Sequence, residues 1–166
     1  GLPVTLVTRD KDMAQLVRAG DVYWDYAANE RYHHDEIEER FGCVPERFVH
    51  YLALTGDSVD NIPGVPGVGP KTAAALMREF PSLDALYADL ERVRRLPIRG
   101  AAKLPEKLLQ HRDAAYLARQ LTAIACDMPL DIDHAALRPR APDMANLTAF
   151  FDRLGFGPML RRQAER

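Results

Sequence analysis

The segment from Ile62 to Lys71 constrains the fold of this chain more than any other, because it contains three prolines and three glycines. Proline holds φ at about −65° and has no amide hydrogen, whereas glycine accepts positive φ and close backbone approach. Pro70 stands where a helix can begin, since the first turn of a helix leaves its amides unpaired. The segment therefore predicts a short, stiff hairpin that leads directly into a helix.

The predicted hairpin is suited to binding an anion. Without a Cβ at Gly67 and Gly69, the amides at the start of the next helix can approach a phosphate, and the helix dipole favours negative charge there. A cation at a helix N-terminus is otherwise unfavourable by about 0.3–1 kcal/mol, so Lys71 indicates a nearby phosphate. The alternative is a tight turn with a surface lysine. The segment follows a helix, which excludes a Walker loop, and backbone amides position DNA without reading its sequence.

Two pairs of aspartates precede this hairpin. Asp10 and Asp12 follow the first predicted strand, where alternation along an extended backbone would turn both to one side. Asp57 and Asp60 lie three residues apart and can share one face of a turn or a helix end. If the four carboxylates converge, divalent cations must offset their repulsion, and Mg²⁺ and Mn²⁺ prefer such oxygen ligands. The alternative is that Asp57 and Asp60 are turn and cap residues and that Asp12 is a helix N-cap.

The first 26 residues predict a fragment of an α/β layer. Residues 4–8 have apolar side chains on both faces, which is typical of a buried parallel strand, and residues 22–24 give a second strand-like stretch. Residues 12–18 predict a short helix between them, and no convincing strand follows Trp24. Since two strands seldom form a stable sheet, we expect the rest of the layer to precede residue 1, removed by truncation or present as another chain.

Residues 27–166 predict one helical unit, because no internal repeat or low-complexity linker interrupts them. Gly42 is expected to end a helix at 35–41, and Pro45 and Pro70 to begin the next ones. Ser82 can cap a helix at 83–90. Two further helices are expected at 114–124 and from Asp143 to Gly155.

Composition and charge narrow the class of protein. With 166 residues, of which 47% are apolar, the chain is long enough for about one globular domain. It has no apolar run of the ~20 residues of a membrane span and no basic signal-peptide region, so the cytoplasm is the default location. Cys43 and Cys126 have no CxxC partner and are expected to be buried thiols.

The net charge of −2 conceals a segregation of charges. Residues 25–46 contain seven acids against two arginines, whereas residues 92–112 contain seven lysines and arginines against one glutamate. The basic stretch would attract a phosphate backbone, and the alternative is a solvated surface. Without the four aspartates named above, the net charge changes from −2 to +2. The four aspartates therefore account for the net negative charge, and we expect bound cations to offset it at the proposed site.

Two segments resemble motifs of a known family. They are residues 8–17, Thr-Arg-Asp-Lys-Asp-Met-Ala-Gln-Leu-Val, and residues 52–64, Leu-Ala-Leu-Thr-Gly-Asp-Ser-Val-Asp-Asn-Ile-Pro-Gly. Both are similar to segments of the bacterial 5′-3′ exonuclease and flap endonuclease family, which includes the N-terminal nuclease domain of DNA polymerase I. The similarity continues through residues 96–101 and up to residues 154–157. The chain thus resembles the C-terminal portion of the family's nuclease.

The resemblance implies a mainly α fold with a remnant of a PIN-like, parallel-sheet α/β layer. Residues 1–26 would be the edge of the nuclease core, and residues 27–166 a helical DNA-binding domain with a helix-hairpin-helix motif of the helix-3-turn-helix type. Two Mg²⁺ or Mn²⁺ ions would be held by Asp10, Asp12, Asp57 and Asp60. A K⁺ ion would be held by the backbone carbonyls of Leu54, Thr55, Pro63, Val65 and Val68. DNA would be contacted by Gly67, Val68, Gly69, Pro70, Lys71, Thr72, Arg99 and Lys103.

The implied function is sequence-independent hydrolysis of DNA at 5′ flaps, nicks or gaps by a two-metal mechanism. The family's N-terminal acidic cluster and helical arch have no counterpart in these residues. The isolated chain is therefore expected to bind duplex DNA but to need the missing N-terminal half, present as a separate fragment or lost, for cleavage. The alternatives are a non-catalytic helix-hairpin-helix module and the nuclease domain of a DNA polymerase I.

Overall fold

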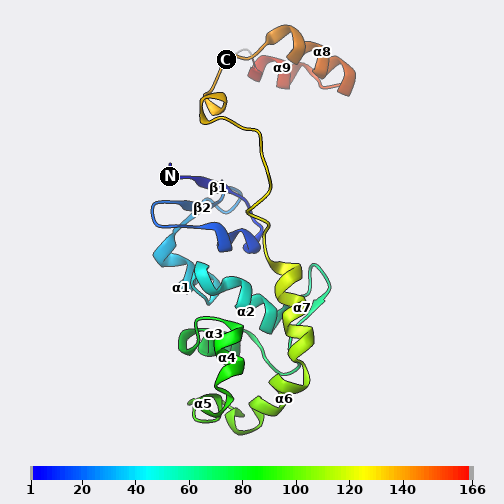
Figure 1. The fold of residues 1–166 in the computed structure, drawn as a ribbon. Coiled ribbons are helices and arrows are strands. Elements are labelled where there is room, and N and C mark those ends of the chain that lie inside the picture. The colour runs from blue at the N-terminus through cyan, green and yellow to red at the C-terminus, as the bar shows by residue number, and fades with distance from the viewer. Residues whose placement is uncertain (1, 165–166) are drawn as a thin grey trace. The chain divides into compact units, whose positions relative to one another are not determined.

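The computed structural model describes residues 2–164, which form two compact units (Figure 1). The first unit spans residues 1–126 and the second spans residues 127–166. The chain is mostly helical with small sheets, which confirms the predicted fold class. The boundary predicted after Tyr26 between a nuclease core and a helical domain stays a prediction; in the first unit, Tyr23 shares one hydrophobic core with Phe48 and Leu54.

A three-stranded sheet opens the first unit. Strand β1 (Thr5–Val7) pairs in parallel with β2 (Val22–Asp25), which pairs antiparallel with β3 (Glu30–His33). The prediction that no strand follows Trp24 is wrong. The sequence of β3, Glu-Arg-Tyr-His, has no apolar alternation, so its pairing with β2 across a turn decides its conformation. The predicted parallel pairing of the first strand is confirmed by β2, whereas its burial stays a prediction: among the described residues β1 pairs only with β2 and its ends are exposed.

Helix α2 (Phe48–Thr55) is the centre of the helical core. It follows the 3-10 helix η3 (Pro45–Arg47). It packs against α3 (Pro70–Glu79), α7 (Arg112–Thr122) and the 3-10 helix η1 (Lys11–Leu16). Leu52 and Leu54 are completely buried, and each such side chain contributes about 1.5–3 kcal/mol by burial. Before it, η2 (His34–Glu36) continues into α1 (Ile37–Phe41), which ends at Gly42 with φ 89° as predicted. Residues that follow α2 directly are therefore held by a rigid element.

Two of the remaining helices of the first unit, α3 and α4, begin at the predicted signals. Pro70 starts α3 (Pro70–Glu79), and the Ser82 hydroxyl accepts a hydrogen bond from the Ala85 amide at 3.1 Å to cap α4 (Leu83–Ala88). Such a cap contributes about 1 kcal/mol. The others are α5 (Leu90–Arg94), η4 (Ala101–Lys103), α6 (Leu104–Gln110) and α7 (Arg112–Thr122).

Two very short strands join α2 to the hairpin. Strand β4 (Gly56–Asp57) pairs antiparallel with β5 (Ile62–Pro63). A Cβ on Gly56 would lie 2.6 Å from the Ile62 carbonyl oxygen, and a Cβ on Gly64 would lie 2.5 Å from the Leu54 carbonyl oxygen. Only glycine permits this backbone crossing. The crossing therefore holds both Asp57, on β4, and the start of the hairpin, which follows β5.

The second unit is built around two helices. The Asp143 carboxylate accepts a hydrogen bond from the Asn146 amide at 3.1 Å and caps α8 (Met144–Leu154), which ends at Gly155 with φ 67° as predicted. The unit also contains η5 (His134–Leu137) and α9 (Pro158–Ala164). The rings of Phe150, Phe151 and Phe156 lie 5.6 to 6.4 Å apart. This aromatic cluster holds the loop after α8 against the helix.

The two cysteines differ in environment. Cys43 is buried, and burial raises the pKa of its thiol to about 12, so the expectation of a buried thiol is confirmed there. The same expectation is wrong for Cys126, which is exposed because it follows the end of α7 in an extended segment. Within residues 2–164, every helix is too short or too polar to span a membrane.

Candidate metal centre and nucleic-acid interface

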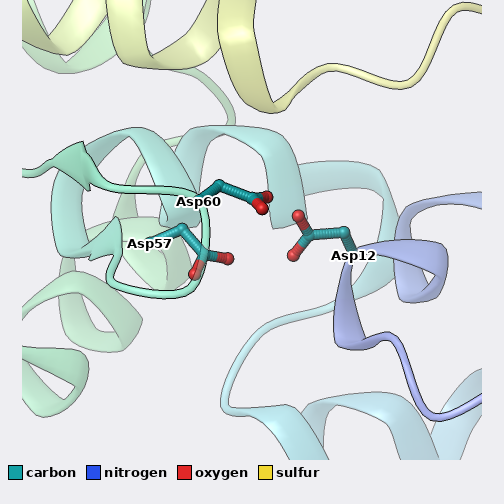
Figure 2. Close-up of side chains that lie close together, drawn as sticks. All are labelled: Asp12, Asp57 and Asp60. Atoms are coloured by element: carbon teal, nitrogen blue, oxygen red, sulfur yellow. The ribbon is translucent and has the colours of Figure 1, made fainter.

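Three of the four predicted aspartates lie together in the first unit. Asp12, Asp57 and Asp60 each offer a carboxylate oxygen, and these oxygens all lie within 4.8 Å of one another. Figure 2 shows the carboxylates of Asp57 and Asp60 pointing toward that of Asp12. Asp12 comes from η1, Asp57 from β4, and Asp60 from the turn between β4 and β5. The packing of η1 on α2 therefore brings the two acidic segments together.

Asp57 is held in place by two donors. It is 3% exposed, and its Oδ1 accepts the Val59 amide at 2.8 Å while its Oδ2 accepts the Lys11 ammonium. Burial by itself raises the pKa of Asp57, but the bonds from Lys11 and Val59 outweigh it and leave the pKa below its usual value. Asp57 is thus a turn residue, as the alternative interpretation expected, and also an ionised member of the acidic cluster.

Asp12 carries the unsatisfied oxygen of the cluster. Its Oδ1 is buried and has no hydrogen-bond partner among the described residues, and the nearest cation, the Lys11 ammonium, lies 3.7 Å away. Burial is the largest cause that raises the pKa of Asp12, and the charges of Asp57, Asp10 and Asp60 raise it further. A buried carboxylate oxygen without a donor, facing two other carboxylates, is a fitting ligand for a hard divalent cation.

Asp10 lies beside this cluster and is not one of the three. Its side chain turns back to accept the Asp12 amide at 3.0 Å and caps η1, so Asp10 rather than Asp12 is the N-cap. The expected alternation is wrong here, because residues 11–16 are helical and not extended. Asp10 lines a cavity of about 310 Å³ together with Asp57 and Asp60. Its role as a metal ligand stays a prediction.

Sequence reasoning missed Lys11 as a member of the site. Its ammonium bonds to Asp57 and lies near Asp12, and it also borders the cavity. These carboxylates raise the pKa of Lys11, although burial alone would lower it, so the side chain stays charged. The signal was present, because Lys11 stands between the two aspartates of the Asp-Lys-Asp segment.

The glycine hairpin presents its backbone to solvent. Val65 and Val68 are buried and anchor it, whereas Gly67, Gly69 and Lys71 are exposed. Gly67 has φ 83°, which favours glycine, and Gly69 is extended. Among the described residues, the amides of Gly67 and Gly69 have no backbone acceptor, and α3 has no side-chain N-cap. The hairpin therefore has the exposed donors that an anion site requires.

The carbonyls predicted to bind K⁺ lie where α2, β5 and the hairpin meet. The Leu54 carbonyl accepts the Val65 amide at 2.9 Å, and the Val65 carbonyl accepts the Val68 amide at 2.9 Å. Each keeps a second lone pair. Binding of K⁺ by these carbonyls and those of Thr55, Pro63 and Val68 stays a prediction. Of the other predicted DNA contacts, Arg99 and Lys103 are exposed and Thr72 is half-buried.

With this geometry in view, comparison with known proteins identifies the family. Residues 43–145 match the family model described as 5′-3′ exonuclease, C-terminal SAM fold. This match covers more than half of the chain, so the chain belongs to the 5′-3′ exonuclease family. The resemblance inferred from the motifs is thereby confirmed.

Relatives of known identity are longer than this chain. DNA polymerase I of Pseudomonas aeruginosa is 45% identical over 155 residues, which are 93% of this chain and 17% of the polymerase. A 5′-3′ exonuclease of Buchnera aphidicola subsp. Schizaphis graminum is 37% identical over 132 residues, 80% of this chain and 46% of that protein. A bacteriophage T5 flap endonuclease complex with DNA and metal ions shares the fold, with a TM-score of 0.60 at 24% identity over 72% of this chain and 42% of that one. The chain thus spans less than half the length of each.

Proposed function

We propose that this chain is the DNA-binding and part of the metal-binding portion of a structure-selective 5′-3′ exonuclease or flap endonuclease. The observation that carries the proposal is the convergence of Asp12, Asp57 and Asp60 in the same compact unit that exposes the glycine hairpin. Family membership and the T5 complex with DNA and metal ions support it. The substrate would be a 5′-flap, nicked or gapped duplex, and the place of action the cytoplasm.

The acidic cluster would hold Mg²⁺ or Mn²⁺, with Asp10 at its edge. Bound ions of this kind help generate hydroxide from water and stabilise the charge that develops on a phosphate during hydrolysis. The chain's own part is to keep the carboxylates ionised and aligned: η1 presents Asp12, and the β4–β5 crossing presents Asp57 and Asp60. Lys11 offsets part of the negative charge and adds a cation to the lining of the cavity.

The hairpin would hold the duplex away from the acidic cluster. Residues 67–72 would contact phosphates through backbone amides and Lys71, with Arg99 and Lys103 adding charge, and K⁺ would sit on the carbonyls named above. Such contacts give position without sequence information, so binding would be indifferent to sequence and sensitive to salt. We assign residues 1–26 to the edge of the nuclease core and residues 27–166 to DNA binding.

A second candidate function is a DNA-binding module that does not cut by itself. It is favoured by the size of the acidic cluster, which has three carboxylates among the described residues, in a chain that spans 17% of the Pseudomonas polymerase and 46% of the Buchnera exonuclease. Further ligands for a pair of ions would then come from an N-terminal part of the nuclease, in a polymerase or in a stand-alone exonuclease. On this account the isolated chain binds a flap and leaves it intact.

One experiment separates these functions. The 166-residue chain is incubated with a labelled 5′-flap duplex in Mg²⁺ or in EDTA, and binding and cleavage are followed in parallel for the wild type and for Asp57→Ala. Mg²⁺-dependent cleavage that Asp57→Ala abolishes supports the nuclease. Binding without cleavage supports the module. A chain that neither binds nor cuts the flap would contradict both.

A further inference from the structure

The basic stretch of residues 92–112 contains two kinds of cation. One kind already serves the fold: Arg92 pairs with Glu79 at 2.5 Å, and Arg94 pairs with Glu91 at 3.1 Å. The guanidinium of Arg112 lies over the rings of Tyr87 and Tyr116. The other kind has no carboxylate within ion-pair distance in the described part of the chain, and its members are Arg95, Arg99, Lys103 and Lys107. The second kind is available to a ligand.

Lys107 is placed against the hairpin by the packing of the unit. It lies on α6, forty residues after Gly67. A Cβ built on Gly67 would lie 2.8 Å from Nζ of Lys107 and 3.9 Å from its Cδ and Cε. The lysine stem therefore runs over the bare backbone of the hairpin, and the ammonium stands at the point where the chain has no side chain of its own. No sequence pattern predicts this contact, because the two residues are distant along the chain.

The surface that Lys107 reaches consists of donors. The amides of Gly67 and Gly69 lack backbone acceptors among the described residues, and the N-terminus of α3 lacks a side-chain cap. Lys71 lies in the first turn of the same helix, where a cation is unfavourable without an anion. Glu106, the acidic neighbour of Lys107 in sequence, faces Arg94 at 3.6 Å. Positive charge from two separate segments thus meets the hairpin, and no carboxylate of residues 2–164 pairs with Lys71 or Lys107.

We infer that Lys107 binds a DNA phosphate together with the hairpin, so that the phosphate interface is built from two segments, residues 67–72 and α6. The inference rests on the DNA binding proposed above and adds a phosphate-binding residue that the hairpin motif does not contain. The ammonium supplies charge next to amides that supply geometry, which is the combination that grips a phosphate strongly. Arg92, Arg94 and Arg112 serve the fold instead.

The test compares two variants that each remove one positive charge from the same basic stretch. Lys107→Gln loses the ammonium at the hairpin, and Arg92→Gln loses a guanidinium that already pairs with Glu79. Affinity of the full chain for a labelled nicked duplex is measured by fluorescence anisotropy over a series of KCl concentrations. Lys107→Arg and far-UV circular dichroism control for charge retention and folding.

We expect Lys107→Gln to bind the duplex about tenfold more weakly than the wild type at 0.1 M KCl. The plot of log affinity against log salt should also become less steep by about 0.9, the value of one phosphate contact. Arg92→Gln should keep the wild-type slope, and Lys107→Arg should restore binding. Equal slopes for Lys107→Gln and the wild type, with DNA still bound, would overturn the inference alone. Failure of the wild type to bind would overturn the proposed function as well.

Discussion

The hairpin and the acidic cluster are neighbours in sequence but are built in opposite ways. The hairpin is local and works through missing side chains: Gly67 and Gly69 expose backbone donors that any Cβ would begin to cover. The cluster is assembled from two segments 45 residues apart and works through side chains that are present, namely Asp12 and Asp57. Adding a methyl group should therefore damage the first region, and removing a charged oxygen should damage the second.

The largest effect is expected at the junction that both regions share. Gly64→Ala would place a Cβ 2.5 Å from the Leu54 carbonyl oxygen, in backbone that cannot move aside, and should lower the free energy of unfolding by about 3 kcal/mol or more. Gly69→Ala is the matched control, because its Cβ would meet nothing within 4 Å and its backbone is extended. Urea unfolding followed by circular dichroism measures both. Equal midpoints would show that the crossing tolerates a side chain.

The next effect tests the acidic cluster. Asp57→Asn should weaken Mn²⁺ binding by about a hundredfold, since a metal ligand contributes at least as much as the groups that orient one. Isothermal titration calorimetry measures the affinity. Asp35→Asn removes the same charge from an exposed residue outside the cluster and should bind Mn²⁺ like the wild type. Comparable losses of affinity in the two variants would mean that Mn²⁺ is attracted by the overall negative charge and is not bound by the cluster.

The third effect tests the hairpin by adding a side chain. Gly69→Ala should keep the fold but weaken binding to nicked duplex about tenfold, because its methyl group occupies the open space through which a phosphate approaches. Gly157→Ala, whose Cβ also meets nothing within 4 Å, adds the same methyl group in the second unit. Anisotropy titrations at one salt concentration suffice. Unchanged affinity of Gly69→Ala for the duplex would contradict phosphate binding by the backbone amides of the hairpin.

A smaller effect on Mn²⁺ affinity is expected from removing the ammonium of Lys11, which competes with the ion for Asp57. Lys11→Gln should tighten Mn²⁺ binding by up to about fivefold, because a partly exposed ion pair with Asp57 worth up to about 1 kcal/mol no longer competes. Calorimetry provides the affinity, and Lys71→Gln serves as the charge-matched control. Weaker binding in Lys11→Gln would instead indicate that the lysine positions Asp57 for the ion.

The smallest effect concerns the scaffold beneath both regions. Hydrogen bonds from the Tyr116 hydroxyl at 2.6 Å and from Arg119 at 3.1 Å hold the pKa of Asp84 below its ordinary value of 3.8. A carboxylate with a lowered pKa stabilises the fold above its unfolded pKa, and this stabilisation is lost as the pH falls through the folded value. The free energy of unfolding should therefore decrease on acidification below about pH 4. Asp84→Asn should flatten this decrease in urea titrations; an unchanged pH profile would contradict the assignment.

Much of the fold could be predicted because its signals are local. Pro70 begins α3, Ser82 caps α4, Asp143 caps α8, and Gly42 ends α1 at the expected residues. Strand β3 could not be predicted in this way, because its polar sequence becomes a strand only through hydrogen bonds to β2. The predicted short helix forms at residues 11–16, and Asp10 caps it, so Asp10 and Asp12 do not share the direction expected from an extended backbone.

The candidate site likewise has one part specified by local sequence and another that depends on long-range contacts. Local sequence signals specify the hairpin, since proline fixes φ where it occurs and glycine allows the positive φ of Gly67 without help from distant residues. Long-range packing instead brings Asp12 to Asp57 and Asp60, pairs Lys11 with Asp57, and places Lys107 at Gly67. Contacts across 40 residues or more depend on how α2 buries its neighbours, and this packing is a property of the whole core rather than of any segment.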